Sequence, residues 1–457
     1  MDEDKRMEEG TNSPHNEYNH ATKLEINSGG DSIEHGTLEG AHYCVNDTSE
    51  RCSPWNGCNL ADFVMPFFLF IVGDGVAIAL ALKRIPKVKV TIKRIILRTL
   101  KLLFWGLLLE GGYLHARDDL SFGVDLTFIQ WCGVLQRIAF VYCVVALIET
   151  FTTKLRPTTL SPGNLSIFTS YKWQWFGGFV AFVIYMVTTL SLYVPDWSFV
   201  DYKSSKPKRY TVICGMRGHL GPACNAVGYV DRQIWGVNHL YPHPVLRRLK
   251  ACRFSSPAYG PRRKEPPAWC RAPFEPEGLL SSISAILSST IGIHYGHVLI
   301  HFKLHSERLK QWLSMGFVLL LLGITLHFTN AIPINKQLYS FSFVCVTSGA
   351  ARIVFSVLYI LIDVWGLGTP FLFLEWIGMN AMLVFVVGAQ GIFAAFVNGW
   401  YYNDPNNSLV NWIQNHVFIN VWHSEKLGTL LYVIFGEITF WGVVAGILHK
   451  FRIYWKL

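Results

Sequence analysis

The chain has 457 residues, of which 51% are hydrophobic, 14% are aromatic and only 16% are charged. Soluble domains carry about 25% charged residues, so this deficit argues against an ordinary soluble protein and indicates a polytopic membrane protein. The formal net charge is +9, but the basic residues lie mainly in short connectors, which indicates a topological signal rather than a nucleic-acid-binding surface. We therefore expect the lipid bilayer as a partner and no nucleic acid.

Residues 1–51 are polar and acid-rich, with few large apolar side chains, and this composition predicts a disordered tail. A turn-rich stretch, SPWNGCNLAD, follows at residues 53–62. It leads directly into the first apolar segment, 63–82, whose length at about 1.5 Å per residue matches the roughly 30 Å of a bilayer core. We therefore predict one membrane domain over residues 52–457, with Asp62 at the mouth of its first span.

The fold class that we predict is an all-α, polytopic transmembrane bundle with about nine spans. The apolar segments that define these spans are about 63–82, 95–114, 133–151, 175–194, 279–302, 312–328, 338–365, 371–397 and 427–448. Basic connectors follow the first, third, fifth and last spans, so the positive-inside rule assigns them to the cytosol. Residues 195–277 form one long hydrophilic loop, which the same alternation assigns to the lumenal or outer face together with Asp62.

Ionisable residues inside spans cost about 2.5–3.5 kcal/mol each on insertion scales, so each one is a functional candidate. Five residues qualify, namely Asp74, Arg137, Arg352, Glu375 and Glu437. Arg137 and Glu375 lie near span ends, where the alternative is that they extend to the interface. Asp74 and Arg352 both fall near mid-span, where an internal ion pair is one interpretation.

The long loop places acidic, basic and aromatic groups close together, in GYVDR at 228–232 and NHLYPH at 238–243. A histidine there could act as a general base near neutral pH, and the alternative is a folded loop whose histidines only form hydrogen bonds. The histidines lack the tight spacing of metal ligands, so no metal site is predicted. Four cysteines on an oxidising face allow two disulfides in three connectivities, and loop-closure entropy favours Cys214–Cys224 as one of them.

From Ser53 onward the sequence resembles the heparan-alpha-glucosaminide N-acetyltransferase family, most closely its plant members. The stretches that carry the resemblance are SPWNG (53–57), LADFVMPFFLFIVG (60–73), GVLQRIAFVY (133–142), GHLGPACNAVGYVDRQIWGVNHLYPHP (218–244), FEPEGLLSSISAI (274–286) and GMNA (378–381). They occur in the family order and cover nearly all of residues 53–457. The resemblance implies a polytopic enzyme that takes acetyl groups from cytosolic acetyl-CoA and transfers them to a glucosamine end in the lysosomal lumen.

In the family scheme, a lumenal histidine just before the SPWNG turn accepts the acetyl group or removes a proton from the amine. That position is Cys52 in this chain, and residues 1–51 do not contain the LDxFRG-like motif of the helix that begins the region in the family. We therefore expect little or no acetyl transfer from the chain with Cys52. The expected site residues are Cys52, Asp62, Asp231 and His239 for catalysis, and Arg137, Arg94 and Arg98 for the phosphates of acetyl-CoA.

The expected co-substrate is acetyl-CoA and the expected acceptor an amino sugar, in a lysosomal or vacuolar membrane with the plasma membrane as the alternative. A homo-oligomeric assembly is left open. For the basic connector that holds Arg94 and Arg98, the alternative is a purely topological role. Two other interpretations of the whole chain also fit its buried charges, a transporter of sugars or small anions without chemistry and a non-enzymatic remnant.

Overall fold

The computed structural model describes residues 53, 55–73, 88–112, 126–152, 166–201, 207–242, 244–249, 251–252, 266–389, 402 and 407–455. The predicted disordered tail, Cys52 and Asp74 lie outside the described residues. Every statement below on the fold and the site concerns the described part of the chain.

The described chain is mostly helical and contains six segments long and apolar enough to cross a membrane, which confirms a helical multi-pass class. These segments are α5 (Val134–Thr152), α7 (Lys172–Ser191), α9 (Leu279–His301), α10 (His305–Phe328), α11 (Phe341–Tyr359) with η8 (Ile360–Val364), and Leu427–Lys450, which comprises most of α17 (Glu425–Leu431), η12 (Tyr432–Ile438) and α18 (Thr439–Lys450). Each coincides with a predicted span to within a few residues, except that α10 begins seven residues before the predicted span 312–328.

The eighth predicted span, 371–397, is bent rather than continuous in its described part. It consists of η9 (Thr369–Phe371), α12 (Leu372–Met379), α13 (Ala381–Val384) and η10 (Phe385–Ala389). Its two halves, Thr369–Met379 and Ala381–Gly388, meet at 73°. The break lies at Asn380, whose side chain accepts a hydrogen bond from the backbone N–H of Trp455 at 3.2 Å. This hydrogen bond therefore connects the bend of the eighth predicted span to the C-terminal segment of the chain.

The first two predicted spans are only partly represented among the described helices. The first contains η1 (Leu60–Phe63), α2 (Val64–Phe68) and η2 (Leu69–Gly73), and the second contains α4 (Val88–Leu107) and η3 (Leu108–Gly112). α4 is long enough to span a membrane, but five basic side chains, at 89, 93, 94, 98 and 101, interrupt its apolar sequence before its last two turns. The remaining helices are short and comprise α6 (Ser166–Ser170), α15 (Leu409–Ile413), η11 (Gln414–Ile419) and α16 (Asn420–Trp422).

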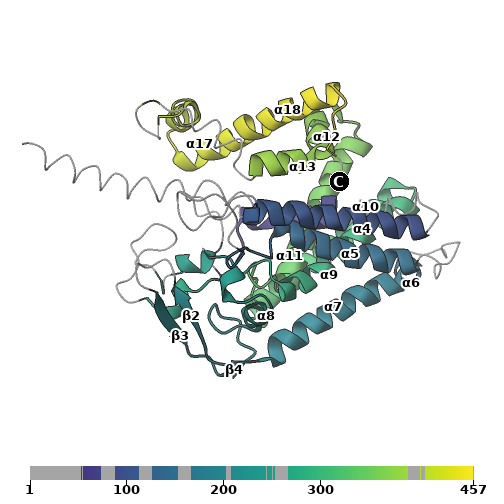
Figure 1. Ribbon diagram of the computed structural model, residues 1–457. Helices are drawn as coiled ribbons and strands as arrows, with labels where there is room; N and C mark the ends of the chain where they lie inside the picture. The colour runs from purple at the N-terminus through teal and green to yellow at the C-terminus, as the bar shows by residue number, and fades with distance from the viewer. Residues whose placement is uncertain are drawn as a thin grey trace, which may run out of the picture.

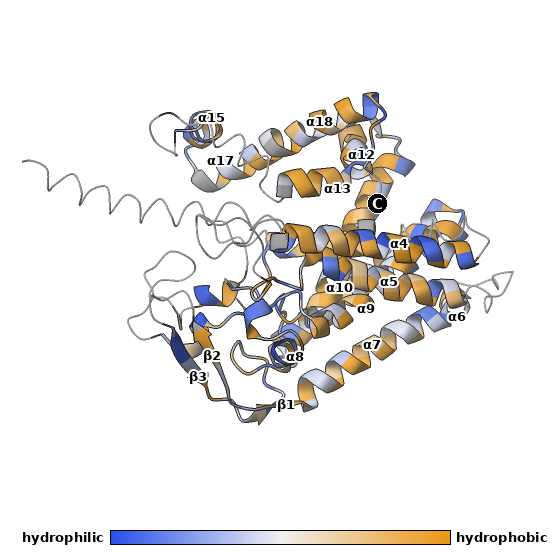
Figure 2. Ribbon diagram, in the orientation of Figure 1, coloured by the Kyte–Doolittle hydropathy of each residue, from blue (hydrophilic) through white to orange (hydrophobic). Residues whose placement is uncertain are grey.

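α9 forms the centre of the bundle. Nearly every side chain from Leu280 to Val298 is buried, and α5, α7, α10 and α11 all contact this helix (Figure 1). Its many serine, glycine and alanine residues allow neighbouring backbones to approach closely, as in other membrane bundles. By contrast, α7 and α10 expose apolar side chains such as Phe179 and Leu321, as expected for lipid contact. The hydropathy colouring of Figure 2 shows hydrophobic residues along the length of α7.

α10 and α11 pack closely against each other through glycine. A Cβ atom added at Gly349 would lie only 2.8 Å from the carbonyl oxygen of Gly316. No larger side chain fits at this contact without separating the helices. The contact between these small residues therefore holds α11 against α10. It also sets how deep in the bundle the polar side chains of α11 lie.

The long hydrophilic loop folds at one end of the bundle and contains short strands, which the all-α prediction did not include (Figure 1). β2 (Trp197–Asp201) pairs antiparallel with β3 (Lys208–Val212), and β1 (Tyr193–Val194) pairs antiparallel with β4 (Met216–Arg217). One α-helix, α8 (Ala226–Ile234), and three short helical turns complete the loop, namely η5 (Val237–His239), η6 (Val245–Arg248) and η7 (Ala268–Arg271). The disulfide Cys214–Cys224 confirms the predicted bridge, and Cys252–Cys270 forms the second one.

Candidate functional site

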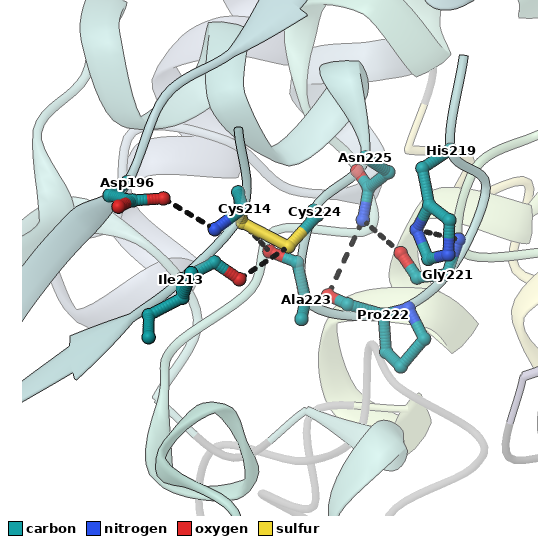
Figure 3. The surroundings of a disulfide bond; sticks show 9 residues. All are labelled: Asp196, Ile213, Cys214, His219, Gly221, Pro222, Ala223, Cys224 and Asn225. Carbon is teal, nitrogen blue, oxygen red and sulfur yellow. Dashed lines mark hydrogen bonds between the residues drawn. A yellow bond between two sulfur atoms is a disulfide. The ribbon is translucent and has the colours of Figure 1, made fainter. Parts of the chain in front are cut away.

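The start of α8 is fixed by a disulfide, whose surroundings Figure 3 shows, and by a helix cap. Cys214 and Cys224 are bridged, and the backbone N–H of Cys214 donates to Asp196 Oδ1 at 2.6 Å. Directly after the bridge, Asn225 Oδ1 accepts a hydrogen bond from the backbone N–H of Gly228 at 2.7 Å, the usual role of an N-cap asparagine. These contacts fix the direction of α8, and that direction brings Asp231 to the bundle.

Asp231 connects α8 to the central helix. Its Oδ1 atom accepts a hydrogen bond from the backbone N–H of Leu279 at 2.8 Å, so a side chain of the loop caps the N-terminus of α9. Oδ2 has no hydrogen-bond partner, although the side chain is fully buried. Gly278 is required beside it, because a Cβ atom there would lie 1.8 Å from Asp231 Oδ2. The free carboxylate oxygen therefore lies against the backbone where α9 begins.

Arg137 lies beside this junction, near the start of α5, and its guanidinium is surrounded by acceptors. Nη2 donates to the carbonyl of Pro276 and to Ser281 Oγ, the latter at 2.6 Å, and Nε donates to Ser282 Oγ at 3.3 Å. The guanidinium carbon also lies 5.1 Å from the centre of the Tyr339 ring. Arg137 thus connects α5 to the segment that enters α9, and its donors are used within the protein.

Glu275 forms the second carboxylate of the site and joins three segments. Its Oε2 atom accepts hydrogen bonds from Gln130 Nε2 at 2.9 Å and from the backbone N–H of Tyr241 at 3.2 Å. The side chain is fully buried, and Glu277, two residues later, is also buried. We call Asp231, Glu275 and Glu277 the carboxylate cluster.

His239 lies at the edge of the same junction. Its Nδ1 atom lies 2.7 Å from the carbonyl oxygen of Ile129, next to Gln130. Because a carbonyl can only accept, Nδ1 carries the proton, and the lone pair of a neutral ring then lies on Nε2. The half-exposed ring also faces Trp131, with 5.9 Å between ring centres. His239 therefore has the tautomer that a general base needs at Nε2. Among the described residues, no group of three His, Cys, Asp or Glu side chains is arranged to hold a metal ion.

Burial and mutual repulsion raise the proton affinity of the cluster. Burial raises the pKa of Asp231 to about 7, although the hydrogen bond from Leu279 and the charges of Arg137 and Arg232 oppose this rise. The pKa of Glu275 lies well above its usual value because of burial and then the charges of Glu277, Glu110 and Asp231. Burial, followed by the neighbouring carboxylates, also raises the pKa of the Cys132 thiol, so this cysteine is not an activated nucleophile.

The raised pKa of Asp231 predicts that the protein loses stability as the pH rises from about 4 to about 7. In this window the carboxyl is ionised in the unfolded chain but protonated in the folded one, so the folded state binds more protons. A tenfold difference in proton affinity is worth about 1.4 kcal/mol, so this group alone accounts for roughly 4 kcal/mol across the window. Thermal unfolding in detergent at pH 5 and pH 7.5 measures the effect.

The variant Asp231→Asn, which keeps the acceptor for Leu279, should show a weaker dependence on pH than the wild type. Asp196→Asn is the matched control, because Asp196 is exposed, lies outside the carboxylate cluster, and as asparagine keeps the acceptor for the backbone N–H of Cys214. An unchanged pH dependence in Asp231→Asn would contradict the assignment.

Asp62, expected as a lining residue, is instead engaged by the turn that precedes the first helix. The buried carboxylate accepts hydrogen bonds from the backbone N–H groups of Ser53 and Asn59, at 3.3 and 2.9 Å, and pairs with Lys336 Nζ at 3.3 Å. The turn also contacts the residue next to Glu275 of the carboxylate cluster, because Trp55 packs edge-on against Phe274 at 5.6 Å between ring centres. These contacts indicate that Asp62 positions the turn.

The structure brings Asp231, His239 and Arg137 to one junction but does not bring Arg94 and Arg98 there. α4 and α5 run antiparallel, and Arg98 lies over the ring of Tyr142, further along α5 than Arg137. Arg94 is exposed and lies one turn further from the junction. The three arginines therefore do not form one phosphate site, and position 52 lies outside the described residues.

Sequence reasoning missed several residues of the junction, namely Gln130, Cys132, Glu275 and Glu277. The two glutamates belong to FEPEG (274–278), which is part of a stretch that resembles the family. Two acidic residues directly before an apolar helix are the signal that could have identified them. Gln130 and Cys132 carried no such signal, because only the folded loop brings them to Glu275.

No protein-family model matches the chain. Curated relatives are found, however, and both are heparan-alpha-glucosaminide N-acetyltransferases. The chain is 30% identical over 423 residues to that of Mus musculus and 28% identical over 420 residues to that of Homo sapiens. These alignments cover 89% and 88% of this chain but 56% and 55% of the relatives, so the chain spans just over half of their length.

Proposed function

The chain belongs to the heparan-alpha-glucosaminide N-acetyltransferase family, and we propose that it transfers acetyl groups from cytosolic acetyl-CoA to an amino sugar across the membrane. The observation that supports this proposal most is the junction of Asp231, Glu275 and His239. Two stretches that carry the resemblance, 218–244 and 274–286, supply these residues, and a third, 133–142, supplies Arg137, which binds Ser281 next to them. This junction is a buried acidic site at one end of the membrane bundle, and it supports the proposed function.

The chemistry that this junction supports is attack of an amine on a thioester. The carboxylate cluster attracts the protonated amine, and a bound ammonium ion favours the ionised form of Asp231. His239 Nε2 accepts one proton, the amine nitrogen then bonds to the carbonyl carbon, and the carbon–sulfur bond breaks. The thiolate of coenzyme A takes the second proton of the amine. His239 acts as the base in this proposal, Asp231 binds the amine, and Arg137 and Asp62 position the surrounding segments.

We further propose nine spans, by adding the bent pair and the two partly described segments to the six candidates. The loop 195–277 then lies in the lumen of a lysosome or vacuole, and the basic connectors lie in the cytosol, where Arg94 and Arg98 are available to acetyl-CoA. A glycosylation tag placed after Leu457 tests the arrangement. The tag should remain unmodified, whereas a tag inserted near exposed Arg209 should be glycosylated.

Transfer of labelled acetyl from acetyl-CoA to glucosamine in membranes tests the function. We expect a low rate with the chain as it stands, because Cys52 replaces the family histidine. This rate should fall at least tenfold further in Asp231→Asn and in His239→Gln, but not in Asp196→Asn. A transporter without chemistry would give no product in any variant, including Cys52→His, and that outcome would contradict the proposal.

A further inference from the structure

The acidic tail, residues 1–51, is followed by a turn that is held against the long loop. The indole N–H of Trp55 donates to the carbonyl oxygen of Leu220 at 2.9 Å, and Ala61 packs against Val245 at the start of η6. Residues 1–51 contain no apolar segment long enough to cross a membrane, so the tail stays on the side of the bundle that carries the loop. This placement follows from the contacts of the turn and holds for either orientation of the chain in the bilayer.

Four basic side chains lie close together on the loop beside this turn. Arg247 and Arg248 belong to η6, and Arg247 Nη2 donates to the backbone carbonyl of Arg271 in η7 at 2.9 Å. The guanidinium carbon of Arg271 lies 5.2 Å, and Nζ of Lys208 lies 5.5 Å, from the centre of the Tyr210 ring. We call Lys208, Arg247, Arg248 and Arg271 the basic face.

The basic face belongs to a loop with a large excess of positive charge. Residues 195–277 contain fourteen Lys and Arg and six Asp and Glu, and three of these acids, the carboxylate cluster, are buried. Of the others, Asp196 accepts a hydrogen bond from the backbone N–H of Cys214, and Asp201 lies opposite Lys208 in the strand register. Lys208 is exposed and the three arginines are partly exposed. Because like charges this close repel one another, a polyanion that binds the basic face lowers this repulsion.

The acidic tail carries the opposite charge. Residues 1–51 contain twelve Asp and Glu and four Lys and Arg, which gives a formal net charge of −8 against +8 for residues 195–277. The last two acids of the tail, Asp47 and Glu50, precede Ser53 by six and three residues. Three to six residues of extended chain reach about 10 to 20 Å, so acids of the tail begin within reach of η6.

We propose that the acidic tail docks on the basic face and shields it from other polyanions. A segment joined to its binding surface by a short linker acts at an effective concentration in the millimolar range, so individually weak charge pairs suffice. The docking does not depend on acetyl transfer, since a chain without activity would still hold its tail against the loop.

Binding of a labelled peptide tests the docking. The peptide has the sequence of residues 1–50 with Cys44→Ser, and it is added in detergent to the full chain and to a truncated chain that lacks residues 2–50. The truncated chain should bind the peptide at least tenfold more tightly, because the tail of the full chain already covers the basic face. Its affinity should fall at least tenfold when the salt concentration is raised from about 0.05 M to about 0.5 M, because salt screens exposed charges.

Variants on both sides identify the charges that are used. In the truncated chain, Arg248→Gln combined with Arg271→Gln should weaken binding at least tenfold. Lys303→Gln combined with Lys310→Gln is the matched control, because these exposed lysines lie beyond the far end of α9, about 35 Å along the helix from the loop. A peptide with Asn and Gln in place of its Asp and Glu should not bind, and this comparison leaves the membrane domain unchanged.

Cross-linking of the full chain with a carbodiimide, which joins carboxylates to amines, locates the tail directly. Acids of the tail should be joined to Lys208, at a yield independent of dilution, and not to Lys303 or Lys310. Equal binding of the peptide by the full and truncated chains, or by the truncated chain and its variant at Arg248 and Arg271, would overturn the proposal. Cross-links that disappear on dilution would place the tail of a second copy on the basic face, which would also overturn it.

Discussion

Replacement of Arg137 by methionine should prevent stable assembly of the bundle, at a cost on the order of 3–5 kcal/mol. The substitution removes the donor that the carbonyl of Pro276 and the hydroxyl of Ser281 share at the start of α9, and leaves that carbonyl with the Ser281 hydroxyl alone. It also removes a cation whose charge favours the ionised form of Asp231. The expected result is a large fall in the midpoint of thermal unfolding in detergent and a low yield of monodisperse protein.

Two further variants test the reason for this loss. Arg137→Lys keeps the charge but cannot reach several acceptors at once, so its stability should lie between those of the wild type and of Arg137→Met. Arg209→Met makes the same change at an exposed position of β3 and should behave like the wild type. If Arg137→Met unfolded at the wild-type temperature, the guanidinium would have no structural role.

Replacement of Cys52 by histidine, in a chain that is also given the LDxFRG-like helix of the family, should raise acetyl transfer by about 10²- to 10⁴-fold, the usual contribution of a general base. An ordinary thiol with a pKa near 8.5 is almost fully protonated at acidic lumenal pH, whereas an imidazole with a pKa near 6.5 is a usable base. The residue that follows position 52 is well fixed, because the backbone N–H of Ser53 donates to buried Asp62. Labelled acetyl transfer to glucosamine measures the gain.

The same turn offers a matched control for this prediction. Cys58 is a free, half-buried cysteine five residues after the turn begins, and Cys58→His introduces an imidazole at a different point of the turn. This variant should show no gain. High activity of the chain with Cys52 unchanged would instead indicate that His239, with its lone pair on Nε2, performs the base function alone.

The membrane helices were predictable because hydrophobic length is a local property. α5, α7, α9, α10 and α11 coincide with apolar segments that need no tertiary information. The bend at Asn380 was not predictable, because the apolar pattern continues through it. The short strands were also missed, since β2 and β3 pair across a loop whose sequence lacks a clear alternation.

The candidate site was predictable only where a residue type was conspicuous. Asp231 and His239 stood out as polar residues in the long loop, and Arg137 as a charge in a span. Their roles were not predictable, because these depend on long-range contacts such as Asp231 with Leu279 and His239 with Ile129. Glu275 was overlooked, since nothing local shows that it meets Gln130.

The cap that Asp231 supplies to α9 has a consequence for biogenesis. α9 is synthesised after the loop, so its first turn can be completed only when the folded, disulfide-bonded loop packs against it. Defects in the loop, such as loss of the Cys214–Cys224 bridge, should therefore appear as retention of a misassembled protein rather than as an inactive enzyme in the correct membrane. A small cationic ligand that joins Asp231 to Glu275 would act as a folding chaperone for such variants, because it would bind only the assembled state.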